Sequence, residues 1–206
     1  MRDAYHEASE DDSLNGSLDT AVLKALHVGE RARDETAINE GNASMGSAAV
    51  EAAREQLGTL EGVKVVVIGA GEMGELVARS LANRDVECDE MLVANRTYDT
   101  ARRLADEIGG EPVKFGEITP HLEETDILVT ATGAPHLIFD GEDLSGHDLV
   151  VLDLANPRDV DEDAENIEGV KLVDIDDLAN VSDSSVERRR RAAEDGTRPG
   201  PSPARA

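Results

Sequence analysis

A glycine-rich turn between two regular elements constrains the fold of this chain more than any other feature. The apolar run Val63-Lys64-Val65-Val66-Val67-Ile68 leads directly into Gly69-Ala70-Gly71-Glu72-Met73-Gly74, and apolar residues at helical spacing follow at Leu76, Val77 and Leu81. A buried strand, the pattern G-x-G-x-x-G and a helix, in this order, form the dinucleotide-binding arrangement of doubly wound α/β proteins. The pattern therefore predicts a nucleotide-binding site at residues 69–74.

Each glycine has a separate physical task in this arrangement. Gly69 permits the tight turn, Gly71 lets the backbone approach a pyrophosphate, and Gly74 lets the helix pack closely against the strand. The unpaired amides and the positive dipole end of the helix then attract the phosphates. The same glycines in an isolated loop would be weak evidence, so the flanking strand and helix are what favour nucleotide binding.

The alternation of elements along the chain predicts a Rossmann-like, doubly wound parallel sheet of the α/β class. We expect strands at 63–68, 90–94, 112–115, 126–131, 149–154 and 170–174, and helices at 72–83, 98–108 and around 117–123. We expect four regions: a helical segment at 1–60, the nucleotide-binding domain at 61–175, a C-terminal helix at 176–195 and a disordered tail at 196–206. In the first region we expect an apolar helix face at residues 18–28 and a second helix that starts near Ser44 or Ser47 and runs to Leu57.

The composition restricts the environment and the partners of the protein. The chain has 45 acidic against 20 basic residues, a net charge of -25, and the acid is spread along its length, which is typical of proteins kept soluble in a salt-rich cytoplasm. Its single cysteine, Cys88, excludes an intrachain disulfide and fits a reducing compartment. The apolar stretches are strand-sized, so we expect a cytoplasmic protein with no membrane span. The five histidines have no metal-ligand spacing, and we expect no metal site.

The end of the second strand indicates which dinucleotide binds. In NAD-specific folds a carboxylate at this point binds the ribose 2′-hydroxyl. Here the strand ends in Asn95-Arg96-Thr97, whereas Asp89 and Glu90 precede it and should lie at its opposite end. The guanidinium of Arg96 offers a fork of donors to a 2′-phosphate, which favours NADP. The alternative is that Arg96 is a solvated loop residue and that Thr97 only caps the next helix.

Several motifs, in order and with matching spacing over about residues 2–195, resemble glutamyl-tRNA reductase. They are G-E-R-A-R-D-E-T upstream, then V-V-V-I-G-A-G-E-M-G-E-L-V-A, A-N-R-T, D-I-L-V-T-A-T-G, V-L-D-L-A-N-P-R-D-V-D and V-D-I-D-D-L. The N-R-T motif is shared with shikimate dehydrogenases, whereas the P-R-D, D-I-D-D-L and R-x-R-x-E-T motifs favour the reductase.

The resemblance implies a reaction in tetrapyrrole (porphyrin) synthesis. A cysteine thiolate attacks the aminoacyl ester of glutamyl-tRNA, and NADPH reduces the thioester to glutamate-1-semialdehyde. The resemblance implies a cofactor site made of Gly69, Ala70, Gly71, Glu72, Met73, Gly74, Asn95, Arg96, Thr97, Thr130, Ala131, Thr132, Gly133, Pro157 and Arg158. Arg158 and Asp159 could instead form a structural ion pair. A homodimer and a glutamate-1-semialdehyde aminomutase partner are compatible with the family resemblance.

The chain departs from the family pattern at the nucleophile. No motif like S-T-C-N-R occurs, and Cys88, flanked by Glu87 and Asp89, has no feature that would stabilise a thiolate. We therefore expect no catalytic residue in this chain, and a truncated form that binds NADPH but does not reduce glutamyl-tRNA by itself. Two alternatives stay open: an NADP oxidoreductase of the shikimate dehydrogenase type, which would need a Lys-Asp pair in a preceding substrate domain, and a non-catalytic NADP-binding regulatory module.

Overall fold

The computed structural model describes residues 24, 38–83, 85–86 and 88–181. The chain divides into two compact units, residues 1–43 and 44–206, and nearly all described residues belong to the second. In the first unit only residue 24 and the helical backbone of 38–43 are described. The expected helix face at 18–28 is outside the described residues apart from Lys24, and so is the expected tail at 196–206.

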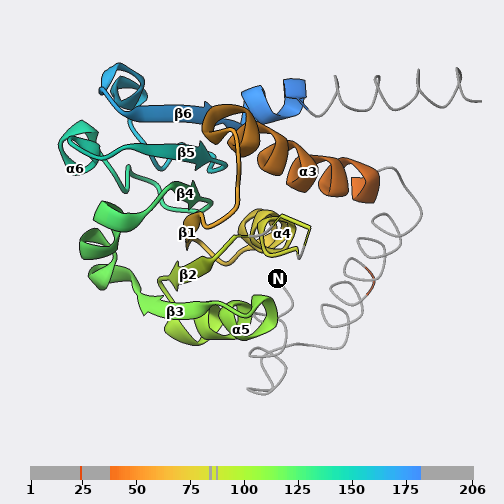
Figure 1. Ribbon diagram of the computed structural model, residues 1–206. Helices are drawn as coiled ribbons and strands as arrows, with labels where there is room; N and C mark the ends of the chain where they lie inside the picture. The colour runs from red at the N-terminus through yellow and green to blue at the C-terminus, as the bar shows by residue number, and fades with distance from the viewer. Residues whose placement is uncertain (1–23, 25–37, 84, 87, 182–206) are drawn as a thin grey trace, which may run out of the picture. The chain divides into compact units, whose positions relative to one another are not determined.

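A six-stranded, all-parallel sheet forms the centre of the second unit (Figure 1). Its order is β3 (Glu111–Lys114), β2 (Glu90–Asn95), β1 (Lys64–Ile68), β4 (Ile127–Thr130), β5 (Leu149–Asp153) and β6 (Val170–Asp174). The chain reverses its direction of travel across the sheet between β1 and β4, which creates the switch point where open α/β sheets bind ligands. The predicted Rossmann-like fold is confirmed, and every predicted strand lies within two residues of an observed one.

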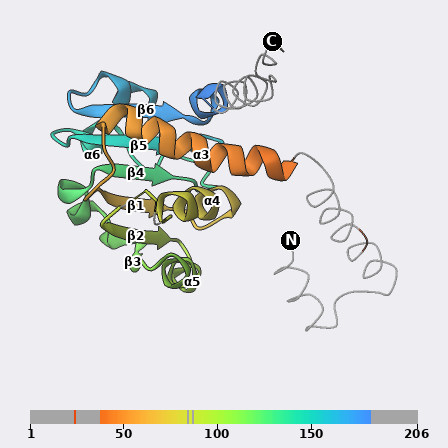
Figure 2. The same ribbon diagram turned by 45° about the vertical axis from the view of Figure 1, so that its right-hand side comes forward.

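One face of the sheet is covered by α3 (Ile38–Leu57), α4 (Glu72–Leu81) and α5 (Tyr98–Ile108), as Figures 1 and 2 show. Four alanines of α3 are buried, at 48, 49, 52 and 53, because their short side chains let the helix approach its neighbours closely. At Gly46 a Cβ would come within 2.1 Å of the Ser80 hydroxyl, so α3 and α4 are in close contact there. The helix begins before the expected Ser44.

Short helices cover the opposite face: η1 (Phe115–Glu117), η2 (Thr119–Glu124), α6 (Gly141–Leu144) and η3 (Glu162–Asn166). The sequence predicted one helix around 117–123, where the structure has η1 and η2. It did not predict α6 and η3, because elements of four and five residues are too short to show helical periodicity. Asp140 begins α6 with a capping box, which accounts for that short helix.

Residues 175–181 are helical and coincide with the start of the C-terminal helix expected at 176–195, whose remainder is outside the described residues. Residues 44–60 belong to the same compact unit as the sheet. The domain boundary expected at residue 60 stays a prediction. Among the described residues, no helix combines the length and apolar character needed to cross a bilayer.

Candidate nucleotide-binding cleft

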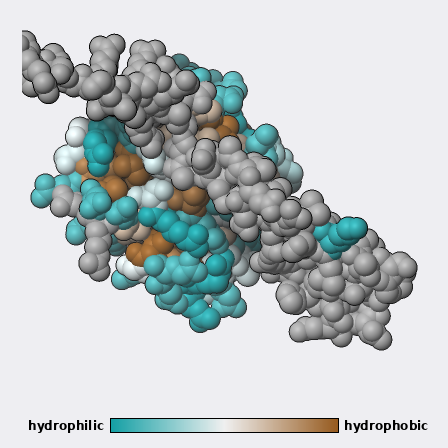
Figure 3. Space-filling model, turned by 90° about the vertical axis from the view of Figure 1, so that its right-hand side faces the viewer, coloured by the Kyte–Doolittle hydropathy of each residue, from teal (hydrophilic) through white to brown (hydrophobic). Residues whose placement is uncertain are grey.

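A cleft of about 410 Å³ opens at the carboxyl ends of β1, β2 and β4, at the switch point of the sheet. Three loops provide most of its lining, at residues 69–71, 95–97 and 131–136, and Phe115 and Ile138 complete it. Figure 3 shows apolar patches among hydrophilic residues on one face of the molecule. The lining combines backbone amides, one arginine and apolar groups, which suits a phosphorylated heteroaromatic ligand.

The three glycines occupy the positions that their predicted tasks require. Gly69 has φ +100°, and a Cβ there would come within 2.3 Å of the Ala131 carbonyl oxygen. A Cβ at Gly74 would come within 1.9 Å of the Gly69 carbonyl oxygen, so the start of α4 rests directly on the turn. Nothing lies within 4 Å of a Cβ at Gly71, which lines the cleft. The turn therefore packs tightly against the protein at Gly69 and Gly74 and leaves free space beside Gly71 in the cleft.

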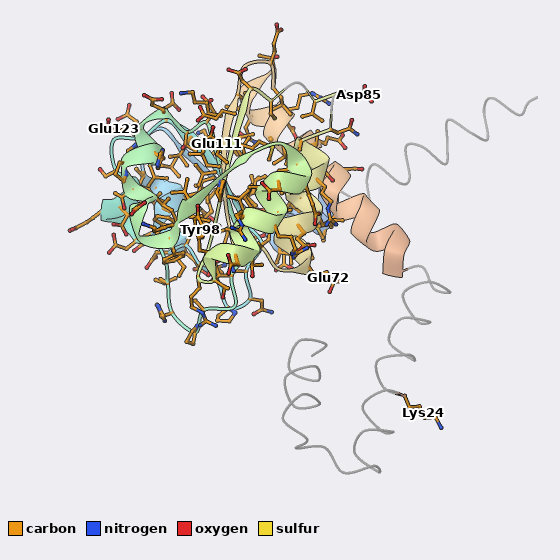
Figure 4. All side chains as sticks on the ribbon, turned by 90° about the horizontal axis from the view of Figure 1, so that it is seen from below. Lys24, Glu72, Asp85, Tyr98, Glu111 and Glu123 are labelled. Carbon is orange, nitrogen blue, oxygen red and sulfur yellow. The ribbon has the colours of Figure 1, made fainter. Side chains whose placement is uncertain are left out.

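The amino end of α4 lies beside this turn. The amide of Glu75 already bonds the Gly71 carbonyl at 2.8 Å, whereas the amides of the first turn have no carbonyl a turn earlier to bond. These amides and the helix dipole favour an anion at the cleft. Glu72 is exposed and projects outward in Figure 4. Met73 and Gly74 support the turn and do not line the cleft.

The loop after β2 places the Arg96 guanidinium at the cleft. The Asn95 side chain accepts a hydrogen bond from the Ala70 amide at 3.3 Å and donates one to the Thr97 carbonyl at 3.2 Å, so it holds two loops together. Arg96 is exposed and forms no hydrogen bond or ion pair with any described residue. Thr97 is the N-cap of α5, although its side chain makes no capping bond. Glu90 lies at the far end of β2, where it pairs with Lys64 at 3.5 Å.

The loop after β4 forms the second wall of the cleft, and buried carboxylates hold it. Thr130, fully buried, donates its hydroxyl proton to Asp153 at 2.9 Å. Thr132 donates both its amide and its hydroxyl to Asp159, at 2.8 and 2.5 Å. Burial raises the pKa of the Asp159 carboxyl, the hydrogen bonds from Thr132 lower it, the Asp153 charge raises it and His136 lowers it.

Six of the residues predicted for the site lie outside the cleft lining: Glu72, Met73, Gly74, Thr130, Pro157 and Arg158. Pro157 follows a cis peptide bond, and Arg158 forms ion pairs with Asp174 at 2.5 Å and with Glu162 at 3.6 Å. The ion-pair alternative for Arg158 thus has a structural counterpart, but with Asp174 and Glu162 in place of Asp159. The assignment of Pro157 and Arg158 to the cofactor site stays a prediction.

The cleft also contains residues that the sequence analysis did not assign. They are Phe115, Ala134, Pro135, His136 and Ile138. Phe115 is 38% exposed, which is unusual for a phenylalanine in a chain that has only two. His136 lies close to the Thr132 motif in the sequence, whereas no local pattern connects Phe115 to the glycine-rich turn. Only the parallel pairing of β2 with β3 brings its segment to the same edge.

Cys88 lies apart from this cleft. It is half-buried, and burial raises the pKa of its thiol while Arg54 lowers it. A raised thiol pKa agrees with the expectation that nothing stabilises a thiolate at Cys88, and burial is its main cause. Within the described ranges, no group of three histidine, cysteine or acidic side chains is placed to hold a metal ion.

Comparison with known proteins agrees with this geometry. Residues 51–181 match the family model described as shikimate / quinate 5-dehydrogenase. The chain is 45% identical over 199 residues to glutamyl-tRNA reductase from Methanopyrus kandleri, covering 93% of this chain and 49% of the relative. The solved structure of glutamyl-tRNA reductase from Methanopyrus kandleri superposes with a TM-score of 0.68 at 42% identity, over 94% of this chain and 50% of that one. A shikimate dehydrogenase in complex with NADP+ shares the fold, with a TM-score of 0.51 at 22% identity, over 69% of this chain and 61% of that one.

The resemblance to glutamyl-tRNA reductase inferred from the motifs is thus confirmed, and the fold is of the NAD(P)-binding Rossmann type. The chain spans about half the length of the curated relatives that it matches.

Proposed function

Because this chain belongs to the shikimate / quinate 5-dehydrogenase family, we propose that it binds NADPH at the cleft beside the glycine-rich turn. We further propose that it serves as the cofactor-binding part of a glutamyl-tRNA reductase. Its similarity to that enzyme, at 45% identity over 93% of the chain, supports the second step. The enzyme's substrate would be glutamyl-tRNA and its product glutamate-1-semialdehyde, in porphyrin synthesis.

One observation carries the choice of cofactor. Arg96 lies at the end of β2 beside the open Gly71 backbone, and no described residue neutralises its charge. A 2′-phosphate on the adenosine ribose would supply the missing anion, and a guanidinium binds phosphate with two parallel hydrogen bonds. NAD has no such phosphate. In this proposal residues 69–74 bind the pyrophosphate, and Asn95 positions the turn and does not contact the phosphate directly.

The bound NADPH would supply a hydride to a thioester. In this chain, the 131–136 wall would orient the reacting end of the cofactor, and the sequence contains no S-T-C-N-R motif from which a thioester could form. We therefore propose that the 206-residue polypeptide alone binds NADPH without reducing glutamyl-tRNA. A homodimer, an aminomutase partner and a cytoplasmic location remain part of this proposal.

Titration of the purified polypeptide with NADPH and with NADH, in high-salt buffer and followed by nucleotide fluorescence, tests the proposal. We expect saturable binding with NADPH preferred by about tenfold or more. Folded protein that gives no saturable signal with either nucleotide would refute it. Incubation with glutamyl-tRNA and NADPH should yield no glutamate-1-semialdehyde, and turnover by the polypeptide alone would contradict the second part.

The match to the shikimate / quinate family model favours one further candidate, a shikimate-type NADP oxidoreductase. Such an enzyme would need a catalytic Lys-Asp pair in a substrate domain that precedes the nucleotide-binding domain. Absence of NADP+ reduction with shikimate or quinate as substrate would exclude it.

A further inference from the structure

Two buried carboxylates next to the cleft have no part in the function proposed above. Asp153 ends β5 and is 1% exposed, and Asp159 lies in the following loop and is 0% exposed. Neither forms an ion pair with a described residue. Asp153 accepts hydrogen bonds from the Thr130 hydroxyl at 2.9 Å and from the amides of Ala155, Asp159 and Val160 at 3.1–3.4 Å. Asp153 therefore holds the backbone of residues 155–160, which includes Asp159, in place.

Asp159 in turn holds both ends of one cleft wall. Its carboxylate accepts the Thr132 amide at 2.8 Å and the Thr132 hydroxyl at 2.5 Å. Its own carbonyl oxygen accepts the amides of Ile138 and Phe139 at 2.6 and 3.1 Å. The Thr132 hydroxyl also accepts the Ala134 amide at 3.1 Å. One residue thus fixes the loop 132–138 at its beginning and at its end.

We infer that Asp159 is a positioning residue for the nicotinamide half of the bound dinucleotide, acting through Thr132. This inference rests on the proposed function. A dinucleotide crosses the switch point of the sheet. With its 2′-phosphate at Arg96 on the β2 side, its other half lies on the β4 side, against the 131–136 wall. Because Asp159 has no exposed surface, it can act on the ligand only by placing that wall.

The energetics separate this role from a purely structural one. Burial raises the pKa of the Asp159 carboxyl, and the other charged groups facing it are Asp153, which raises the pKa further, and His136, which lowers it. A raised folded-state pKa means that the ionised form reduces stability at neutral pH, and that this cost is relieved as pH falls through the folded-state pKa. Among the described residues no cation pairs with Asp159, so only its hydrogen bonds from Thr132 offset the cost of burying the charge. Replacement by the neutral amide should therefore leave the melting temperature unchanged or higher while loosening the wall.

The test compares Asp159→Asn with the wild-type chain, using NADPH and adenosine 2′,5′-bisphosphate as probes. The bisphosphate contains only the adenine half, so it reports on the Arg96 side of the cleft. Asp163→Asn is the matched control, because Asp163 is exposed and four residues further along the chain. We expect Asp159→Asn to weaken NADPH binding about tenfold. The affinity for the bisphosphate should stay within about twofold, the melting temperature should not fall, and Asp163→Asn should match the wild type in all three.

Equal weakening of both ligands with a lower melting temperature would show a general structural role and overturn the inference, as would unchanged NADPH affinity. If Asp159→Asn does not fold, Thr132→Val and Thr132→Ser provide the test. Valine removes the hydroxyl bond to Asp159 and should weaken NADPH selectively, whereas serine keeps that bond and should restore binding, and equal binding by the two variants would refute the inference. Wild-type protein that binds no NADPH would refute the proposed function itself, which distinguishes the two failures.

Discussion

Alanine at Gly71 and at Gly74 should have opposite consequences, although the two positions are three residues apart. At Gly71, φ is -87° and ψ is -174°, which alanine adopts readily, and nothing lies within 4 Å of the added Cβ. The gain from a less flexible unfolded chain, about 0.4–1 kcal/mol, is partly offset by the weaker N-cap. We expect the free energy of unfolding of Gly71→Ala to stay within about 0.5 kcal/mol of the wild type.

At Gly74 the added Cβ would come within 1.9 Å of the Gly69 carbonyl oxygen, which is backbone and cannot rotate away. Ordinary contact would require α4 to move from the turn by about 1.5 Å. Alanine favours a helix interior by about 1 kcal/mol over glycine, but overpacking typically costs 1–3 kcal/mol and here meets a rigid atom. We expect a net loss of about 2 kcal/mol, and a melting temperature lower by about 4–8 °C for a domain of this size.

Thermal unfolding followed by circular dichroism, with NADPH titration on the same samples, tests both variants. Gly71→Ala should melt with the wild type yet bind NADPH at least about tenfold more weakly, because its methyl group occupies the space where the backbone approaches the pyrophosphate. The reasoning is refuted if Gly71→Ala binds NADPH as tightly as the wild type, or if Gly74→Ala melts at or above the wild-type temperature.

Three further outcomes follow from individual side chains. Arg96→Ala should weaken NADPH binding by about 2 kcal/mol and leave NADH binding unchanged, and equal effects on both nucleotides in titration would contradict the 2′-phosphate contact. Because burial raises the pKa of the Cys88 thiol, its reaction with Ellman's reagent at pH 7.5 should be slower than that of free glutathione and should accelerate as pH rises; a faster reaction would contradict a buried, protonated thiol. Arg158→Ala should cost at most about 1 kcal/mol of stability in urea unfolding, since its side chain is 33% exposed. It should leave NADPH affinity unchanged, and weaker binding would restore Arg158 to the cofactor site.

Local patterns in the sequence predicted the elements and the turn at the centre of the site. A run of apolar residues before Gly69 and helical spacing after Gly74 are sufficient to place β1, the turn and α4, because burial and periodicity act within about ten residues. The alternation of elements located the other strands to within two residues. The short helices α6 and η3 were not predicted, because they depend on capping hydrogen bonds and have no apolar stripe at helical spacing.

Side-chain roles at the cleft are harder to predict than its location. Asn95 is expected to bind the nucleotide, which stays a prediction, and the structure adds hydrogen bonds from its side chain to the backbone of Ala70 and Thr97. Arg158 was expected beside the cofactor or paired with Asp159, and it pairs with Asp174 on the neighbouring strand. Such choices depend on which backbone groups and charges lie within 3 Å, and a local pattern contains no information about that distance.

The sequence by itself determined the class of fold, the glycine-rich turn and the family resemblance, because each of these depends on residues that are neighbours along the chain. Only the tertiary structure decided the composition of the cleft. Thr132 and Asp159 are 27 residues apart, and Phe115 reaches the cleft through the pairing of β2 with β3. The sheet order brings these segments together, because parallel strands all end at the same edge and their order decides which of the following loops are neighbours.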